Sequence, residues 1–112
     1  MFLDGVGLGS DEEDLNPFVV ARTPNLSALV GGQLTCSLAN KRSSKILFSP
    51  LDATLGFAGL PQSATGQTAL VTGINAAKIM SGHYGPWPGP TLKSLLDQGT
   101  LFSEAQGLQG GG

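Results

Sequence analysis

The stretch that decides the fold is residues 61–73, PQSATGQTALVTG, in which turn-forming residues lead directly into a run of small side chains. A run of small residues with a proline before it and a glycine after it is typical of a short helix, because the glycine readily adopts the left-handed conformation that ends one. We therefore predict a helix that begins at Ser63 and stops at Gly73.

Ser63 has two interpretations that the helix alone supports equally. The N–H groups and the dipole at the start of a helix favour a phosphate and stabilise an alkoxide, so a serine there is suited to nucleophilic attack. A serine in the first turn is also a common helix cap with no chemical role. The position by itself does not choose between them.

A second motif lies at Asp4. Residues 1–3 are apolar and lead into Asp4 and Gly5, a pattern that predicts the end of a buried strand followed by a sharp turn. A carboxylate at the end of a rigid strand is a common way to place a metal ligand. A plain Asp-Gly turn is the commoner use of the same two residues.

The rest of the chain carries weaker signals for secondary structure. Thr23 and Pro24 before an apolar run, with glycines after it, predict a helix over residues 24–30. Apolar residues on one face predict another helix over residues 91–98. Residues 33–39 alternate weakly, as strands do, and residues 46–48 form a short apolar run.

The composition excludes several classes of protein. The 112 residues have a formal net charge of -2 and only six Lys and Arg, which argues against a nucleic-acid partner. No stretch is long and apolar enough to span a bilayer, so we expect no membrane partner. The single cysteine, Cys36, is compatible with a reducing compartment, and we interpret it as a buried small side chain in a cytoplasmic protein.

Two windows resemble a known enzyme superfamily. Residues 2–7, FLDGVG, resemble the first metal-ligand strand of cofactor-independent phosphoglycerate mutases, and residues 59–61 are similar to the segment that leads into their nucleophile. Residues 62–73 resemble the nucleophile helix of alkaline phosphatases, in which a reactive Ser or Thr is followed nine residues later by Thr-Gly, here Ser63 and Thr72-Gly73. The chain thus resembles the alkaline phosphatase superfamily of metal-dependent phosphoryl-transfer enzymes.

The resemblance implies a fold and a mechanism. It implies an α/β fold, a mainly parallel sheet with flanking helices, of which residues 1–112 form the N-terminal part of a single domain. It implies a phosphomonoester hydrolase or phosphomutase that acts on a small phosphorylated substrate with two divalent metal ions (zinc, manganese or magnesium). Ser63 is the expected nucleophile and becomes a phosphoserine, and Asp4 and Ser63 are expected to contact metal within a few ångströms of each other.

The resemblance also extends to substrate binding. Gln62 stands where alkaline phosphatases have Asp, and we expect it to bind a phosphate oxygen of the substrate rather than metal. We assign Thr65 to substrate binding as well, with a purely structural role in the helix as an equal alternative.

The sequence departs from the superfamily in its metal ligands. Its one histidine, His83, lies in a Gly- and Pro-rich loop, and we interpret it as an exposed loop residue. The further Asp and His ligands of the superfamily follow far downstream of the nucleophile, so we expect this chain to be an incomplete enzyme that does not fully bind the metals. Two alternatives stay open: a non-catalytic fragment, and a phosphate- or nucleotide-binding module. For the latter, residues 5–9, GVGLG, would be the phosphate loop, but Ser10 occupies the place of the third glycine.

Overall fold

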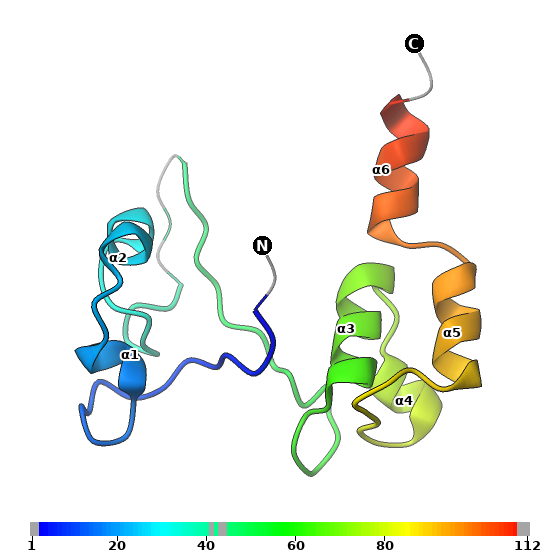
Figure 1. Cartoon of the computed structure of the whole chain (residues 1–112), viewed down its shortest axis with the longest axis horizontal. Coiled ribbons are helices and arrows are strands. Elements are labelled where there is room, and N and C mark those ends of the chain that lie inside the picture. Colours follow the sequence, from blue (N-terminus) through cyan, green and yellow to red (C-terminus); the bar gives the residue numbers. More distant parts are fainter. Residues whose placement is uncertain (1–2, 41, 43–44, 110–112) are drawn as a thin grey trace. The chain divides into compact units, whose positions relative to one another are not determined.

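The computed structural model describes residues 3–40, 42 and 45–109 of the chain. The described residues form short helices joined by long loops (Figure 1). The helices are α1 (Pro17–Val20), α2 (Pro24–Val30), α3 (Ser63–Thr72), α4 (Ala76–Met80), α5 (Pro90–Asp97) and α6 (Leu101–Gln109). The chain divides into two compact units, residues 1–51 and residues 52–112, which we describe separately.

The first unit contains two short helices with clear local signals. The predicted helix over residues 24–30 is confirmed as α2, which has Pro24 in its first turn and ends at Gly31 in the left-handed conformation, with φ 82°. The α1 helix was not predicted. It is capped by Asn16, whose side-chain oxygen accepts a hydrogen bond from the Phe18 amide at 3.1 Å.

A buried asparagine organises the loops of this unit. Asn16 is only 3% exposed, and its side-chain nitrogen donates a hydrogen bond to the Ser10 carbonyl at 2.8 Å. A side chain at Gly9 would clash with it, since a Cβ there would lie 2.8 Å from Asn16 Cγ. The Cys36 amide donates a hydrogen bond to the Gly9 carbonyl at 2.8 Å. The Cys36 side chain is exposed, so our interpretation of it as a buried residue is wrong.

The predicted parallel sheet is also wrong for the described part of the chain. No strand forms there; the pairing is limited to isolated bridges, a parallel one between Gly9 and Thr35 and an antiparallel one between Arg42 and Leu47. Of residues 33–39, only 36–39 form turns, in which the amides of Leu38 and Ala39 bond to carbonyls three residues earlier. Of the expected first strand, residues 1 and 2 lie outside the described residues, and Leu3 belongs to no strand.

A physical reason for the missing sheet is the absence of an apolar layer to cover it. A parallel sheet is covered on both faces by helices and needs continuous apolar strands. The side chains that the structure buries among residues 3–40, 42 and 45–51 are polar, Asn16 and Thr35. Because no apolar side chain is fully buried among these described residues, little free energy is gained to offset the entropy lost on ordering an extended chain.

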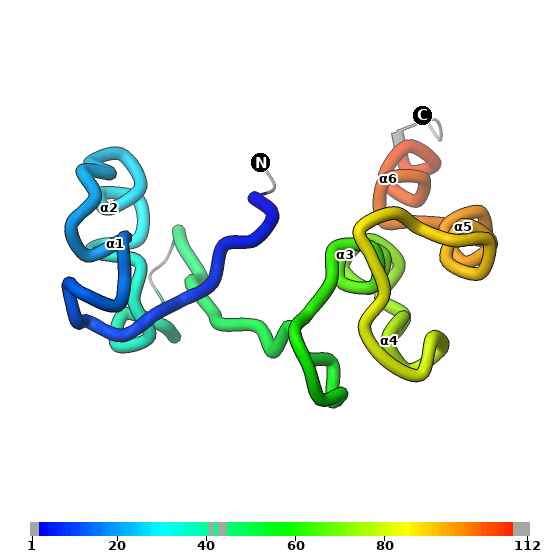
Figure 2. The backbone as a smooth tube through the Cα atoms, turned by 60° about the horizontal axis from the view of Figure 1, so that its bottom comes forward, coloured from blue at the N-terminus to red at the C-terminus, as the bar shows by residue number. Residues whose placement is uncertain are grey.

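The second unit has a small apolar core between helices. The buried side chains of this core are Ala64 in α3, Ala76 in α4 and Leu92 in α5, with Met80 and Leu95 packed at its edge. Figure 1 shows α3 beside α4 and α5, and Figure 2 shows the same grouping from another side. Alanines at the contacts between helices allow their backbones to approach closely.

The helices of this unit agree with the sequence in part. The predicted helix that begins at Ser63 and stops at Gly73 is confirmed as α3, and Gly73 is left-handed with φ 71°. The helix predicted over residues 91–98 is confirmed as α5 with each end one residue earlier. The α4 and α6 helices were not predicted.

The α6 helix extends beyond the core, and its residues from Leu101 to Leu108 are exposed (Figure 1). Among the described residues, no helix combines the length and the apolar character that crossing a membrane requires.

The core predicts a large effect of one substitution. Leu92 is fully buried, so Leu92→Ala removes apolar contacts and leaves a cavity, which we expect to lower the free energy of unfolding by about 2–5 kcal/mol. The matched control is Leu108→Ala, because Leu108 is 85% exposed; its effect should stay within about 0.5 kcal/mol. Urea unfolding followed by far-UV circular dichroism measures both, and equal effects would contradict the core described here.

Candidate functional site

The candidate site lies at the start of α3. Gln62 precedes the helix in extended conformation, with φ -121° and ψ 147°, and its side chain makes no capping hydrogen bond. Ser63 is the first residue of the helix and is half-buried. The extended lead-in and the small residues that follow place the serine where the chain turns into the helix.

The loop at Tyr84 is bonded to the first turn of α3 through Thr65. The Thr65 amide donates to the Tyr84 carbonyl at 3.0 Å, and the Tyr84 amide donates to the Thr65 hydroxyl at 3.3 Å. The same hydroxyl donates to the Gln62 carbonyl at 3.2 Å. Thr65 is 0% exposed, so these bonds are shielded from water and hold residues 83–85 against the helix start.

Gly85 makes this close approach possible. A Cβ atom added there would lie 3.0 Å from Gln62 Cβ, 3.2 Å from the Ser63 nitrogen and 3.4 Å from the Ala64 nitrogen. Two of these three neighbours are backbone atoms, which cannot rotate away as a long side chain could. Glycine is therefore the residue that lets the loop lie directly over the first amides of α3.

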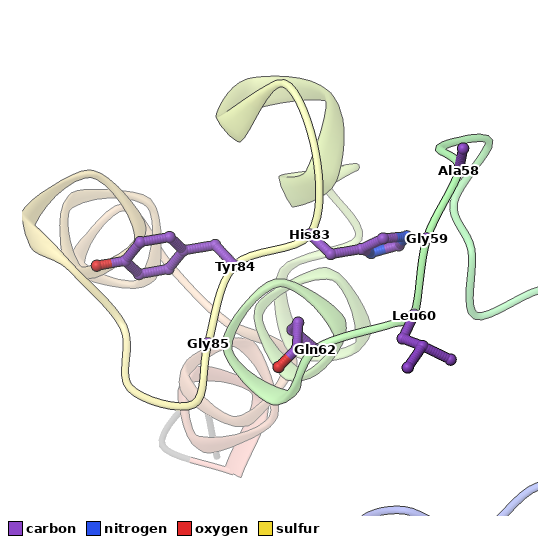
Figure 3. Close-up of a pocket in the computed structure, with 7 residues that line it drawn as sticks. All are labelled: Ala58, Gly59, Leu60, Gln62, His83, Tyr84 and Gly85. Atoms are coloured by element: carbon purple, nitrogen blue, oxygen red, sulfur yellow. The ribbon is translucent and has the colours of Figure 1, made fainter.

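A hollow of about 470 Å³ lies beside this contact (Figure 3). It is lined by residues 58–60, Gln62 and residues 83–85. In Figure 3 the His83 ring points toward the backbone at Gly59, whereas the Tyr84 ring points away to the other side. The hollow is thus lined by the residue that precedes α3, by two glycines and by one imidazole, whereas Ser63 itself is not among the lining residues.

His83 is half-buried, so the interpretation of it as an exposed loop residue is wrong. Its Nε2 lies 3.2 Å from the Phe57 carbonyl oxygen, and its Cδ2 atom would be 3.7 Å from a Cβ at Gly59. Its other ring nitrogen, Nδ1, is buried without a hydrogen-bond partner. The sequence held little signal for this, because the contact depends on two loops that meet only in the folded chain.

The predicted site residues fall in both units. The start of α3 brings together Gln62, Ser63 and Thr65. Gln62 is exposed and lines the hollow, whereas the Thr65 hydroxyl is hydrogen-bonded within the protein. Asp4 belongs to the other unit and is exposed, and its Oδ1 accepts a hydrogen bond from the Gly5 amide at 3.0 Å. The proximity of Asp4 to Ser63, and the binding roles of these residues, stay predictions.

The described residues do not provide a metal site by themselves. Within residues 3–40, 42 and 45–109, no group of three or more His, Cys, Asp or Glu side chains is placed to hold a metal ion. The metal ligands that the resemblance implies are therefore not brought together by this part of the chain. The structure accordingly supports no reaction step that uses a bound metal.

One carboxylate stabilises the loop that leads to the hollow. Asp52 Oδ1 accepts hydrogen bonds from the Thr54 hydroxyl at 2.6 Å and from the Thr54 amide at 2.9 Å. The hydroxyl of Thr54, and secondarily its amide, lower the pKa of Asp52 below the usual aspartate value. The charged form is therefore favoured in the folded chain, which is the behaviour of a turn-forming residue and not of a general acid.

Comparison of the chain with protein-family models, with curated proteins and with solved structures finds no significant match.

Gly85 and Gly66 form a matched pair for testing the site geometry. We expect Gly85→Ala to destabilise the chain and to shift the amide resonances of Ser63 and Ala64, because the new methyl group must displace backbone. Gly66→Ala adds the same methyl group inside α3, where nothing lies within 4 Å, and should stabilise the chain by about 0.5–1 kcal/mol. Thermal unfolding and amide NMR spectra measure the pair; a harmless Gly85→Ala would show that the loop does not lie over the helix start.

Proposed function

We propose that the chain provides the nucleophile and part of the substrate site of a metal-dependent phosphoryl-transfer enzyme, with Ser63 as the nucleophile. The observation that supports this most is the position of Ser63 as the first residue of a ten-residue helix, next to Gln62, which lines a hollow of about 470 Å³. The hollow is open to solvent, and its volume is within the range of small-molecule sites in proteins. The proposal includes a cytoplasmic location and no nucleic-acid or membrane partner.

The helix start favours the charge that the reaction develops. Aligned peptide dipoles give a helix N-terminus a partial positive charge, which stabilises a phosphate and an alkoxide nearby. The amides of Thr65 and Gly66 are bonded to the carbonyls of Tyr84 and Gln62, so they are committed to the protein. The loop at Gly85 lies over the earlier amides, those of Ser63 and Ala64, so the proposal relies on the helix dipole and not on a direct amide contact to substrate.

The proposed reaction has two displacement steps. Ser63 Oγ forms a bond to the phosphorus atom, the P–O ester bond breaks, and the leaving alkoxide departs as an alcohol after gaining the serine proton. Water then attacks the phosphoserine, which releases inorganic phosphate and restores the hydroxyl. In a mutase the second attack comes from a substrate hydroxyl, which leaves as the new phosphate ester.

The metal ions belong to the proposal and not to the described geometry. Bound metals would supply Lewis-acid stabilisation of the phosphoryl oxygens and lower the barrier to hydroxyl ionisation. Since residues 3–40, 42 and 45–109 gather no cluster of three metal-binding side chains, the proposal requires ligands in addition to Asp4 and Ser63. Gln62, which is exposed at the hollow, is proposed to bind a phosphate oxygen through its amide nitrogen.

The nucleophile is tested in the native gene product, expressed from its complete coding region. We expect Ser63→Ala to abolish turnover of a phosphate monoester and to remove a phosphoserine at residue 63 that mass spectrometry detects in the wild type. The fold should survive, since loss of a helix-start hydroxyl costs only about 0.5–2 kcal/mol. Ser63→Thr, which keeps a hydroxyl, is the matched control and should retain part of the activity.

Two outcomes would redirect the proposal. Unchanged turnover in Ser63→Ala would show that another group is the nucleophile. Binding of inorganic phosphate without turnover or phosphoserine in the wild-type gene product would instead support the alternative of a phosphate-binding module.

The 112-residue chain alone should be essentially inactive toward p-nitrophenyl phosphate with added manganese or zinc. The reason is that metal-assisted transfer requires cations in a fixed geometry, and one carboxylate with one neutral hydroxyl does not hold them. Isothermal titration calorimetry should accordingly detect only weak metal binding. Robust metal-dependent turnover that disappears in Ser63→Ala would refute the expectation that further ligands are needed.

A further inference from the structure

The turn at Asp4 brings a carboxyl group beside the nitrogen of the next peptide. The Gly5 amide donates a hydrogen bond to Asp4 Oδ1 at 3.0 Å, so this nitrogen lies against the side chain of the preceding residue. Gly5 has φ 71°, and a Cβ atom added there would meet nothing within 4 Å. Residues 3–7 are exposed and belong to no helix or strand. The pair is therefore accessible to water and has room to rearrange.

This closeness permits a reaction between the two groups. We propose that Asp4 is a modification site, at which the Gly5 nitrogen closes a five-membered succinimide ring and hydrolysis of the ring yields isoaspartate. The modification needs water and no enzyme, metal or substrate, so it is independent of the proposed function.

The reaction has two steps, and neither oxidises or reduces the chain. In the first, the Gly5 nitrogen forms a bond to Asp4 Cγ and loses its proton, while the bond from Cγ to the carboxyl hydroxyl breaks and water leaves. In the second, water adds to one of the two ring carbonyls. Addition at Cγ restores aspartate. Addition at the backbone carbonyl carbon breaks the bond from that carbon to nitrogen, so the chain then continues through the side chain as isoaspartate.

The sequence singles out Asp4 for this reaction. It is the one aspartate followed by glycine, and no asparagine precedes a glycine. Glycine lacks the Cβ atom that would crowd the attacking nitrogen. Asp52 is a natural comparison, because it is also exposed but is followed by Ala53. Its Oδ1 accepts hydrogen bonds from the Thr54 hydroxyl at 2.6 Å and from the Thr54 amide at 2.9 Å, so its carboxyl group is held toward the second following residue.

Isoaspartate changes what residue 4 presents to its surroundings. The backbone becomes one carbon longer, and the remaining carboxyl group is attached directly to Cα instead of Cβ. A metal ligand has to hold its oxygen within a narrow range of positions. In the proposed enzyme, the modification therefore moves the carboxylate of Asp4 away from the position in which it would bind metal.

The competing role of the Gly5 hydrogen bond is purely structural, as part of an ordinary Asp-Gly turn. The experiment incubates the whole folded chain in neutral buffer, beside a synthetic peptide of residues 1–10, and samples both over several weeks. Peptide mapping separates the aspartate and isoaspartate forms of each peptide, and electron-transfer fragmentation identifies which residue carries the isomer. A succinimide is recognised by a mass lower by one water.

We expect isoaspartate at residue 4 of the folded chain, formed at a rate within about tenfold of that in the peptide, whereas residue 52 stays unmodified. Gly5→Ala should slow the conversion at least about tenfold, a barrier higher by about 1.4 kcal/mol, because the added methyl group crowds the nitrogen. Gly7→Ala is the matched control. It adds the same methyl group where nothing lies within 4 Å, away from the reacting pair, and should leave the rate unchanged.

Two substitutions of Asp4 test the ring itself. Asp4→Glu should abolish the reaction, because its longer side chain would have to close a six-membered ring. Asp4→Asn forms the same succinimide with loss of ammonia, so aspartate and isoaspartate should appear together at residue 4.

Three results would overturn the inference. The first is an unmodified residue 4 in the folded chain after the peptide has converted. The second is conversion in Gly5→Ala as fast as in Gly7→Ala. The third is a folded Asp4→Asn chain that forms no isoaspartate, which would show that the turn prevents ring closure.

Discussion

The pairing of Thr65 with Tyr84 is the constraint on which the candidate site depends. Thr65 uses both its amide and its hydroxyl to hold the Tyr84 backbone, and it is 0% exposed. The pairing places Gly85 over the start of α3 and His83 at the wall of the hollow. Without it, a Gly- and Pro-rich loop would have no fixed position relative to Ser63, and the hollow would lose one of its walls.

Sequence patterns predicted the helices whose ends carry strong local signals. Pro24 and Gly31 bound α2, and Gly73 ends α3 in the left-handed conformation, so residues adjacent in the chain decide these boundaries. The sheet was predicted from weaker evidence: short apolar runs, together with a resemblance that no comparison tests. Runs of three residues are shorter than the typical strand of ~5–6 residues, and the described part of the first unit buries no apolar layer against which they could pack.

The candidate site was predictable only where it is local. Ser63 and its place at a helix start follow from one continuous stretch, and the structure places both as expected. The roles of Gly85 and His83 depend on contacts between segments about twenty or more residues apart, such as His83 with Phe57 and Gly85 with Ser63. A glycine-rich segment predicts loops. It does not predict which glycine lies in close contact with the backbone of another segment.

The small core of the second unit has a consequence for the readiness of the site. Ala64, Ala76 and Ala77 are buried around α3 and α4, and alanine has no side-chain rotamers to lose when the chain folds. The alanines of this core are therefore ordered at almost no cost in side-chain conformational entropy, and rotamer freedom is lost only by the larger members, such as Leu92. The start of α3, and Ser63 with it, is thus held without any ligand both by small side chains of fixed shape and by the hydrogen bonds between Thr65 and Tyr84.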